Sequence, residues 1–161
     1  MSANTDRRRS DAATRFIHAS PDTIYQAFAS AEALMQWLPP AGMSGRALEY
    51  DFHEGGLYRI ELRYDEKLST EPGKTTGRTD ITNGRFLELR PGRHITQSVE
   101  FESSDPTFAG EMTMTWSFDI AAEGTTVTIT VDNVPSGINK ADHDAGLRSS
   151  LENLAAFVER R

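Results

Sequence analysis

Four polar side chains in this sequence are suited to orienting a small molecule, because they alternate with charged residues along apolar segments. Tyr50, Tyr58, Tyr64 and Gln97 share the parity of the apolar residues in those segments. Each carries a hydroxyl or amide group that can hydrogen-bond a ligand, and binding pockets are mostly apolar with a few such groups. The same residues could equally be core, with each hydroxyl bonded to a carbonyl or to water.

Apolar residues of the same parity would form the walls of such a pocket. The predicted ligand-binding residues, polar and apolar together, are Trp37, Tyr50, Tyr58, Ile60, Phe86, Gln97, Phe101, Met112, Met114, Trp116, Leu147 and Leu151. Two methionines on one strand face fit this prediction, because thioethers adapt to irregular apolar shapes. An ordinary hydrophobic core uses the same residue types, so both interpretations stay open.

The sequence indicates no metal site and no cofactor. It contains no cysteine, which excludes disulfides, thiolate metal ligands and cysteine nucleophiles. The histidines, at positions 18, 53, 94 and 143, match no metal-binding spacing. His53 takes the outward parity, and the aspartates beside His143 suit the first turn of a helix.

General acid or base chemistry would need a histidine or carboxylate on the inward face, where burial shifts its pKa. Outward parity is predicted instead for Glu49, Asp51, Glu61, Glu100 and Glu111. We therefore expect an inward face without ionisable groups, and no catalytic residue is named. A register slip of one residue would reverse this assignment.

Composition excludes several other classes of function. The net charge of −7 argues against a nucleic-acid partner, which would be bound through clustered Lys and Arg. No apolar run approaches the ~18 residues of a membrane span. The lack of cysteine makes a cytoplasmic location the default expectation. The sequence is compatible with either a monomer or a homodimer.

The segments that position these residues have sequence patterns typical of strands and turns. Apolar alternation predicts strands near residues 14–19, 48–52, 57–64, 78–89, 95–101, 112–118 and 127–131. Gly55-Gly56 supplies a tight hairpin turn, and Gly84 inside a strand indicates a bulge or a close backbone approach. The polar residues 65–77 are predicted to form a long hairpin loop. About six or seven strands with one apolar face each predict an antiparallel sheet that is covered on one side.

Helices are predicted to cover the apolar face of the sheet. Ser20-Pro21-Asp22 opens a short helix, with Ser20 as the cap and Pro21 in the first position. A second short helix around 32–38 ends at Pro39-Pro40. In the segment 140–161, Leu147, Leu151, Leu154 and Val158 form one helical face, as expected of a helix lying across the sheet. The fold class is therefore α+β, with residues 1–13 as a flexible tail and 14–161 as the domain.

An ordered series of motifs carries a family resemblance. The motifs are the Ser-Pro-Asp helix start, Trp37 with Pro39-Pro40, Phe52-His53-Glu54-Gly55-Gly56, Gly84 with Glu88-Leu89-Arg90-Pro91, Gly124-Thr125-Thr126 and a last helix opening at Gly146. Over residues 14–160 the chain resembles the START-like (SRPBCC) superfamily, and within it the Hsp90 ATPase activator homologue-like (AHSA1-type) proteins. The resemblance implies a helix-grip fold, a curved antiparallel sheet around a long C-terminal helix. Many relatives have tryptophan after the glycine of that helix, where this chain has Leu147.

The resemblance implies a shape more than an activity. Our first hypothesis is a domain that binds a small apolar or aromatic molecule beneath the last helix. The second is a cyclase or hydratase type of enzyme that uses the same cavity. The third is an interaction protein with a chaperone partner, and this hypothesis comes from the resemblance alone.

Overall fold

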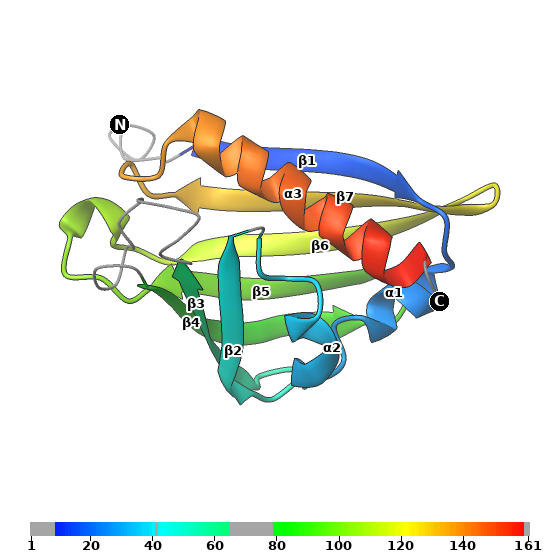
Figure 1. Ribbon diagram of the computed structural model, residues 1–161, viewed down its shortest axis with the longest axis horizontal. Coiled ribbons are helices and arrows are strands. Elements are labelled where there is room, and N and C mark those ends of the chain that lie inside the picture. The colour runs from blue at the N-terminus through cyan, green and yellow to red at the C-terminus, as the bar shows by residue number, and fades with distance from the viewer. Residues whose placement is uncertain (1–8, 41, 65–78, 160–161) are drawn as a thin grey trace, which may run out of the picture.

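The computed structural model describes residues 9–40, 42–64 and 79–159, and it contains a seven-stranded antiparallel sheet that curves around one long helix (Figure 1). In chain order the elements are β1 (Arg9–Ile17), α1 (Pro21–Gln26), α2 (Ala31–Met35), β2 (Met43–Tyr50), β3 (Leu57–Tyr64), β4 (Thr79–Arg90), β5 (His94–Phe101), a 3-10 turn η1 (Pro106–Phe108), β6 (Met112–Ala121), β7 (Gly124–Val134) and α3 (Lys140–Glu159). The strand order is β1-β7-β6-β5-β4-β3-β2, so β1 and β2 are the edges. The α+β class and the helix-grip architecture are confirmed.

Local sequence explains both short helices. Ser20 caps α1 by accepting a hydrogen bond from the Thr23 N–H at 3.1 Å, and Ser30 caps α2 in the same way through Ala33. The second helix stops at Met35, three residues earlier than expected. After Met35 the chain forms hydrogen bonds of the 3-10 type, in which the Gln36 N–H donates to the Ala33 carbonyl and the Trp37 N–H donates to the Leu34 carbonyl.

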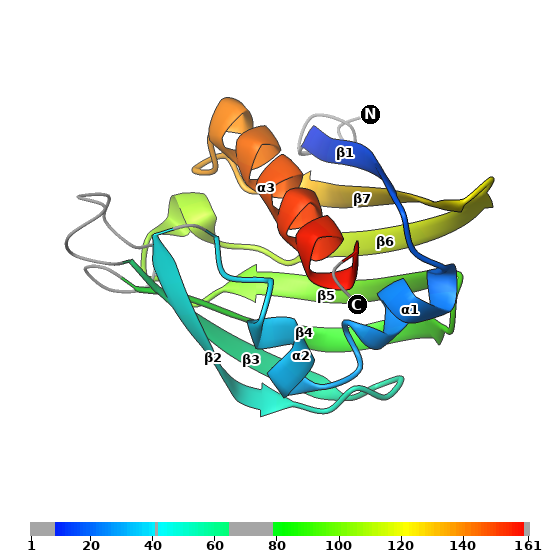
Figure 2. The ribbon, with the colours of Figure 1, turned by 45° about the vertical axis from the view of Figure 1, so that its right-hand side comes forward.

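Helix α3 lies across the concave face of the sheet, as Figure 2 shows. The predicted stripe faces the sheet, and Leu147, Leu151, Leu154 and Val158 are all buried. The indole group of the core residue Trp37 is bonded within the fold. Trp37, between Phe28 and Trp116, donates its indole N–H to the Ala27 carbonyl at 3.0 Å. The end of the concave face that includes Trp37 is therefore filled by interlocking aromatic rings.

Two strand assignments differ from expectation. The β2–β3 register shifts between Ala47 and Glu49, so Leu48 does not share a face with Tyr50 and is 37% exposed. Strand β1 begins at Arg9 and pairs with β7, so it takes in residues assigned to the tail on sequence. The predicted loop at residues 65–77 lies outside the described residues.

Two motif residues of the β2–β3 turn, Glu54 and Gly55, form hydrogen bonds to β4. The Glu54 carboxylate accepts the Leu89 N–H at 3.0 Å and also contacts the Arg90 guanidinium. The Gly55 N–H donates to the Phe86 carbonyl at 2.7 Å. These bonds fix the β2–β3 turn against β4, which gives the motifs around Gly55 and Leu89 a structural role.

Gly84 lies beside Tyr58 in the β3–β4 register. The Tyr58 hydroxyl crosses it and donates to the Ser98 carbonyl of β5 at 2.5 Å. A Cβ atom on Gly84 would lie 1.9 Å from the Ser98 oxygen and 2.8 Å from the Tyr58 hydroxyl. The predicted close backbone approach is confirmed, and the β4 bulge lies further along, between Phe86 and Glu88.

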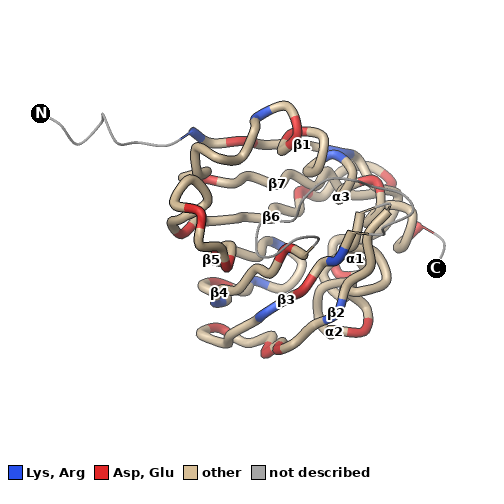
Figure 3. Tube along the Cα trace, turned by 60° about the vertical axis from the view of Figure 1, so that its left-hand side comes forward, with Lys and Arg blue, Asp and Glu red and all other residues tan. Residues whose placement is uncertain are grey.

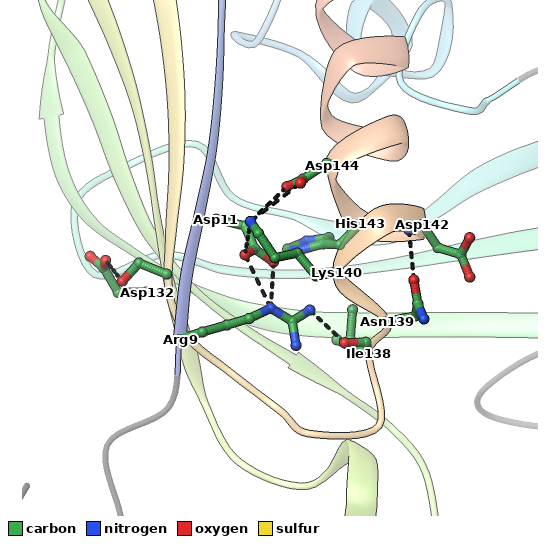
Figure 4. A network of polar contacts seen from close by, with 10 residues as sticks. Arg9, Asp11, Asp132, Ile138, Asn139, Lys140, Asp142, His143 and Asp144 are labelled. Atoms are coloured by element: carbon green, nitrogen blue, oxygen red, sulfur yellow. Dashed lines mark hydrogen bonds and ion pairs between the residues drawn. The ribbon is translucent and has the colours of Figure 1, made fainter.

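A buried carboxylate joins the first strand to the last helix (Figure 4). The Asp11 side chain is fully buried and accepts hydrogen bonds from Arg9 Nε at 3.0 Å, Lys140 Nζ at 3.1 Å and His143 Nδ1 at 2.7 Å. Burial raises the pKa of Asp11, but the bonds from His143, Lys140 and Arg9 outweigh it and hold the pKa below its usual 3.8. This Asp11 clamp fixes the start of α3 against β1.

Replacing Asp11 by Asn should lower the free energy of unfolding by about 2 kcal/mol at pH 7, because charge-assisted hydrogen bonds are lost. A folded-state pKa below the unfolded value stabilises the protein above about pH 4, and this contribution disappears as the pH falls through the folded pKa. The difference between wild type and Asp11→Asn in urea unfolding should therefore shrink at pH 3. The exposed Asp132→Asn variant should change stability by less than about 0.5 kcal/mol. Equal effects of both variants would contradict the clamp.

Replacing Gly84 by Ala should destabilise the protein by about 3 kcal/mol or more, because a carbonyl oxygen occupies the space of the new methyl group. Gly146, in the middle of α3, has nothing within 4 Å of an added Cβ atom, so Gly146→Ala should stabilise by up to about 1 kcal/mol. Urea unfolding of the two variants measures both effects. A Gly84→Ala protein as stable as wild type would show that β4 and β5 do not approach closely.

Candidate functional site

The candidate site is the part of the concave face that α3 and α2 do not fully cover. Gln97 of β5 and Met114 of β6 are direct partners in the middle of the sheet, and both are only half-buried. On the same strands Ile95, Val99, Met112 and Trp116 are all buried. The Gln97–Met114 pair is therefore more accessible than its neighbours on the same face of these two strands.

One side of α3 faces the segment that precedes β2. Asn153 extends from α3 to the Pro39 carbonyl at 3.4 Å, so this side of the helix faces the segment before β2. Gly146 and Ser150 precede Asn153 by seven and three residues, which places them on the same side. Among the described residues, no atom lies within 4 Å of a Cβ atom added at Gly146. We call Gly146, Ser150 and Asn153, on this side of α3, the rim.

The inward residues of β3 become more exposed toward the strand's end. Tyr58 and Ile60 are 3% and 5% exposed, whereas Leu62 and Tyr64 are half-buried. Asp80 of β4 pairs with Leu62, and the Tyr64 hydroxyl lies 3.5 Å from its carboxylate. Asp80 is itself only 6% exposed. This end of the concave face therefore carries a buried carboxylate beside a phenol.

The tyrosine hydroxyls deeper in the fold are already bonded. Tyr58 donates to the Ser98 carbonyl and Tyr50 donates to the Phe28 carbonyl, both at 2.5 Å. Burial raises the pKa of Tyr58 well above its ordinary value, although a hydrogen bond from the Gln97 side chain opposes the shift. Burial likewise raises the pKa of Tyr50. Both phenols are therefore neutral at physiological pH, with their hydrogens directed at the backbone.

The predicted ligand-binding residues divide into two groups. Those buried in the core are Trp37, Tyr58, Ile60, Phe86, Met112, Trp116, Leu147 and Leu151, and those half-buried are Tyr50, Gln97, Phe101 and Met114. Gln97 and Met114 lie together, as their strand parity predicts. Phe101 lies further along β5, with its ring 6.5 Å from that of Phe108. A ligand-binding role for any of these residues stays a prediction.

The expectation of an inward face without ionisable groups is wrong at two positions. Asp80 shares the parity of Phe86, which is six residues away, and this signal was available in the sequence. Asp11 points inward from β1, a strand whose start was assigned to the tail. The outward parity of Glu61 and Arg59 agrees with their ion pairs to Arg46 and Glu102, and charges of both signs alternate along β3 (Figure 3).

Two of the histidines lie beside carboxylates outside the concave face. His53 is exposed beside Asp51, and His94 bonds to Glu88 at 2.5 Å. Within residues 9–40, 42–64 and 79–159, no group of His, Asp or Glu side chains could hold a metal ion. No helix in these same ranges is long and apolar enough to cross a membrane. An open hollow lies outside the concave site, around Pro21, Gly92 and Ile120.

Comparison with known proteins identifies the family. The family described as "Activator of Hsp90 ATPase homolog 1-like protein" matches residues 18–159. Protein CV1439 from Chromobacterium violaceum is 31% identical, with 93% of this chain and 96% of that chain covered and a TM-score of 0.82. No curated protein matches the chain.

Two more distant structures share the fold alone. A protein from Rhodobacter sphaeroides is 19% identical with a TM-score of 0.75, covering 94% of this chain and 92% of that chain. DynU16, a protein in the dynemicin biosynthetic locus, is 18% identical with a TM-score of 0.67, covering 94% of this chain and 48% of that chain. The family match and the similarity to CV1439 both extend over nearly the whole described domain. This chain therefore belongs to the Activator of Hsp90 ATPase homolog 1-like family.

Proposed function

We propose that this protein binds a small, mainly apolar molecule between α3 and the concave face of the sheet. The observation that supports the proposal is the half-buried Gln97–Met114 pair, which lies between buried neighbours on β5 and β6. The rim at Gly146, Ser150 and Asn153 gives such a molecule a way in. Met114 offers an adaptable apolar surface, and the Gln97 amide offers hydrogen bonds, which is the usual composition of a ligand pocket.

The hydrogen bonds of the Tyr50 and Tyr58 hydroxyls favour a ligand-binding function over a catalytic one. A general acid or base works best with a pKa near the operating pH. The phenols of Tyr50 and Tyr58 have pKa values raised by burial, and each donates its only hydrogen to a backbone carbonyl. Neither can transfer a proton to a substrate without breaking a bond that the fold uses.

Binding of 1-decanol provides the test. In proton–nitrogen correlation spectra recorded during a titration, the backbone signals of Gln97, Met114 and Ser150 should move together and saturate. Replacing Met114 by Trp should weaken binding by at least about tenfold, because the indole would fill the space that the alcohol needs. Circular dichroism checks that the variant is folded.

Thr115→Trp is the matched control. Thr115 is the next residue on β6 and faces the convex side, where its hydroxyl lies 3.4 Å from that of Thr96. This variant should bind 1-decanol as wild type does. The proposal fails if 1-decanol shifts no signals of the concave face, or if Met114→Trp binds it as tightly as Thr115→Trp does.

A further inference from the structure

We propose that the concave face selects a ligand that donates a hydrogen bond, such as an apolar alcohol, and that the side-chain oxygen of Gln97 accepts this bond. The inference rests on the proposed function, because it specifies the chemistry of the molecule bound at the Gln97–Met114 pair. Its physical basis is a chain of hydrogen bonds that fixes the direction of the Gln97 amide.

The chain of hydrogen bonds ends at the backbone of β5. The Tyr58 hydroxyl donates to the Ser98 carbonyl at 2.5 Å, and a phenol has one hydrogen to donate. The Tyr58 oxygen can therefore accept a further hydrogen bond but cannot give one. Since Tyr58 is only 3% exposed, its oxygen lies inside the protein, where a partner has to be another group of the fold.

The Gln97 side chain is that partner. Gln97 precedes Ser98 on β5 and is paired with Phe86 of β4, whose ring centroid lies 5.3 Å from that of Tyr58. Burial raises the pKa of Tyr58, and a hydrogen bond from the Gln97 side chain opposes this rise. Such a bond lowers the pKa of a phenol when it is donated to the oxygen. The nitrogen of the Gln97 amide therefore faces Tyr58.

This direction leaves the oxygen at the other end of the amide for a ligand. Gln97 is half-buried beside the half-buried Met114, and no residue in the described part of the chain donates to its oxygen. Turning the amide over would break the bond to Tyr58 and bring two acceptor oxygens together. A ligand hydroxyl can donate to the Gln97 oxygen, whereas a ligand carbonyl cannot.

Tyr50, the β2 partner of Tyr58, has the same polarity. Its hydroxyl donates to the Phe28 carbonyl at 2.5 Å, so its oxygen also can only accept. Tyr50 is half-buried on the same face. A second acceptor on this face therefore favours the same class of ligand.

Two probes with one carbon skeleton, 2-decanol and 2-decanone, test the inference on the full chain. Each is titrated in the spectra described above, where the signals of Gln97 and Met114 report the place and the affinity of binding. Wild type should bind 2-decanol about tenfold more tightly than 2-decanone, because only the alcohol can donate a hydrogen bond. In Gln97→Leu this preference should fall below about threefold. Gln26→Leu makes the same change at an exposed position of α1 and should keep the preference.

Tyr58→Phe tests the positioning role of the phenol. Without its oxygen the Gln97 amide is free to turn and to offer its nitrogen to a carbonyl. The preference for 2-decanol should therefore fall below about threefold although Gln97 is unchanged. A purely structural role of Tyr58 would alter both affinities alike and leave their ratio as in wild type. Circular dichroism checks that each variant is folded.

The outcomes separate the two proposals. If neither probe shifts the signals of Gln97 and Met114, both the proposed function and this inference are overturned. If both bind there and wild type shows no preference for 2-decanol, or if Gln97→Leu or Tyr58→Phe keeps that preference, the inference alone is overturned. The comparison of the two probes on the unaltered protein decides the question even if a variant does not fold.

Discussion

The burial of one apolar stripe of α3 against a sheet with a single apolar face is the interaction on which the rest of this structure depends. The sheet cannot be stable with that face in water, and the helix cannot be stable alone. Leu151 and Leu154, at 1% and 0% exposure, are the centre of this contact. The Asp11 clamp and the bond from Asn153 to Pro39 then fix the helix at two points along its length.

A straight helix cannot cover a curved sheet evenly, and this mismatch explains where the candidate site lies. Near Trp37 the gap is filled by aromatic rings, with Phe28 just after α1, Trp37 just after α2 and Trp116 on β6. Toward Leu62 and Tyr64 the inward side chains are half-buried, and a Cβ atom added to Gly146 of α3 would meet no described atom within 4 Å. The residues that could bind a ligand are thus those that the fold itself does not use for close contact.

Most of the fold could be predicted because it depends on patterns of period two and period 3.6. The parity of Tyr58 and Ile60 placed them inside, and the spacing from Leu147 to Val158 placed the helix across the sheet. The errors occurred where a pattern is interrupted. The register shift between Ala47 and Glu49 turns Leu48 outward, and the residue types in this segment do not predict the shift.

The site could be predicted only in part, because parity shows which way a side chain points but not how tightly its neighbours enclose it. Gln97 and Met114 share this parity with Trp116, and only the three-dimensional structure separates the accessible pair from the buried ring. Asp80 lies within the strand predicted over residues 78–89, and its inward direction follows from the parity of Phe86. Asp11 required knowledge that β1 pairs with β7 from Arg9 onward.

The pairing of β1 with β7 also has a consequence for biosynthesis. The first strand finds its partner more than a hundred residues later, and Asp11 bonds to a histidine 132 positions further along the chain. Contacts of such high sequence separation slow folding, since a long loop must close before they form. On a ribosome, the concave face would stay uncovered until α3 has left the exit tunnel. For that interval the nascent chain presents an apolar sheet to the cell, and this is the stage at which it most needs protection from aggregation.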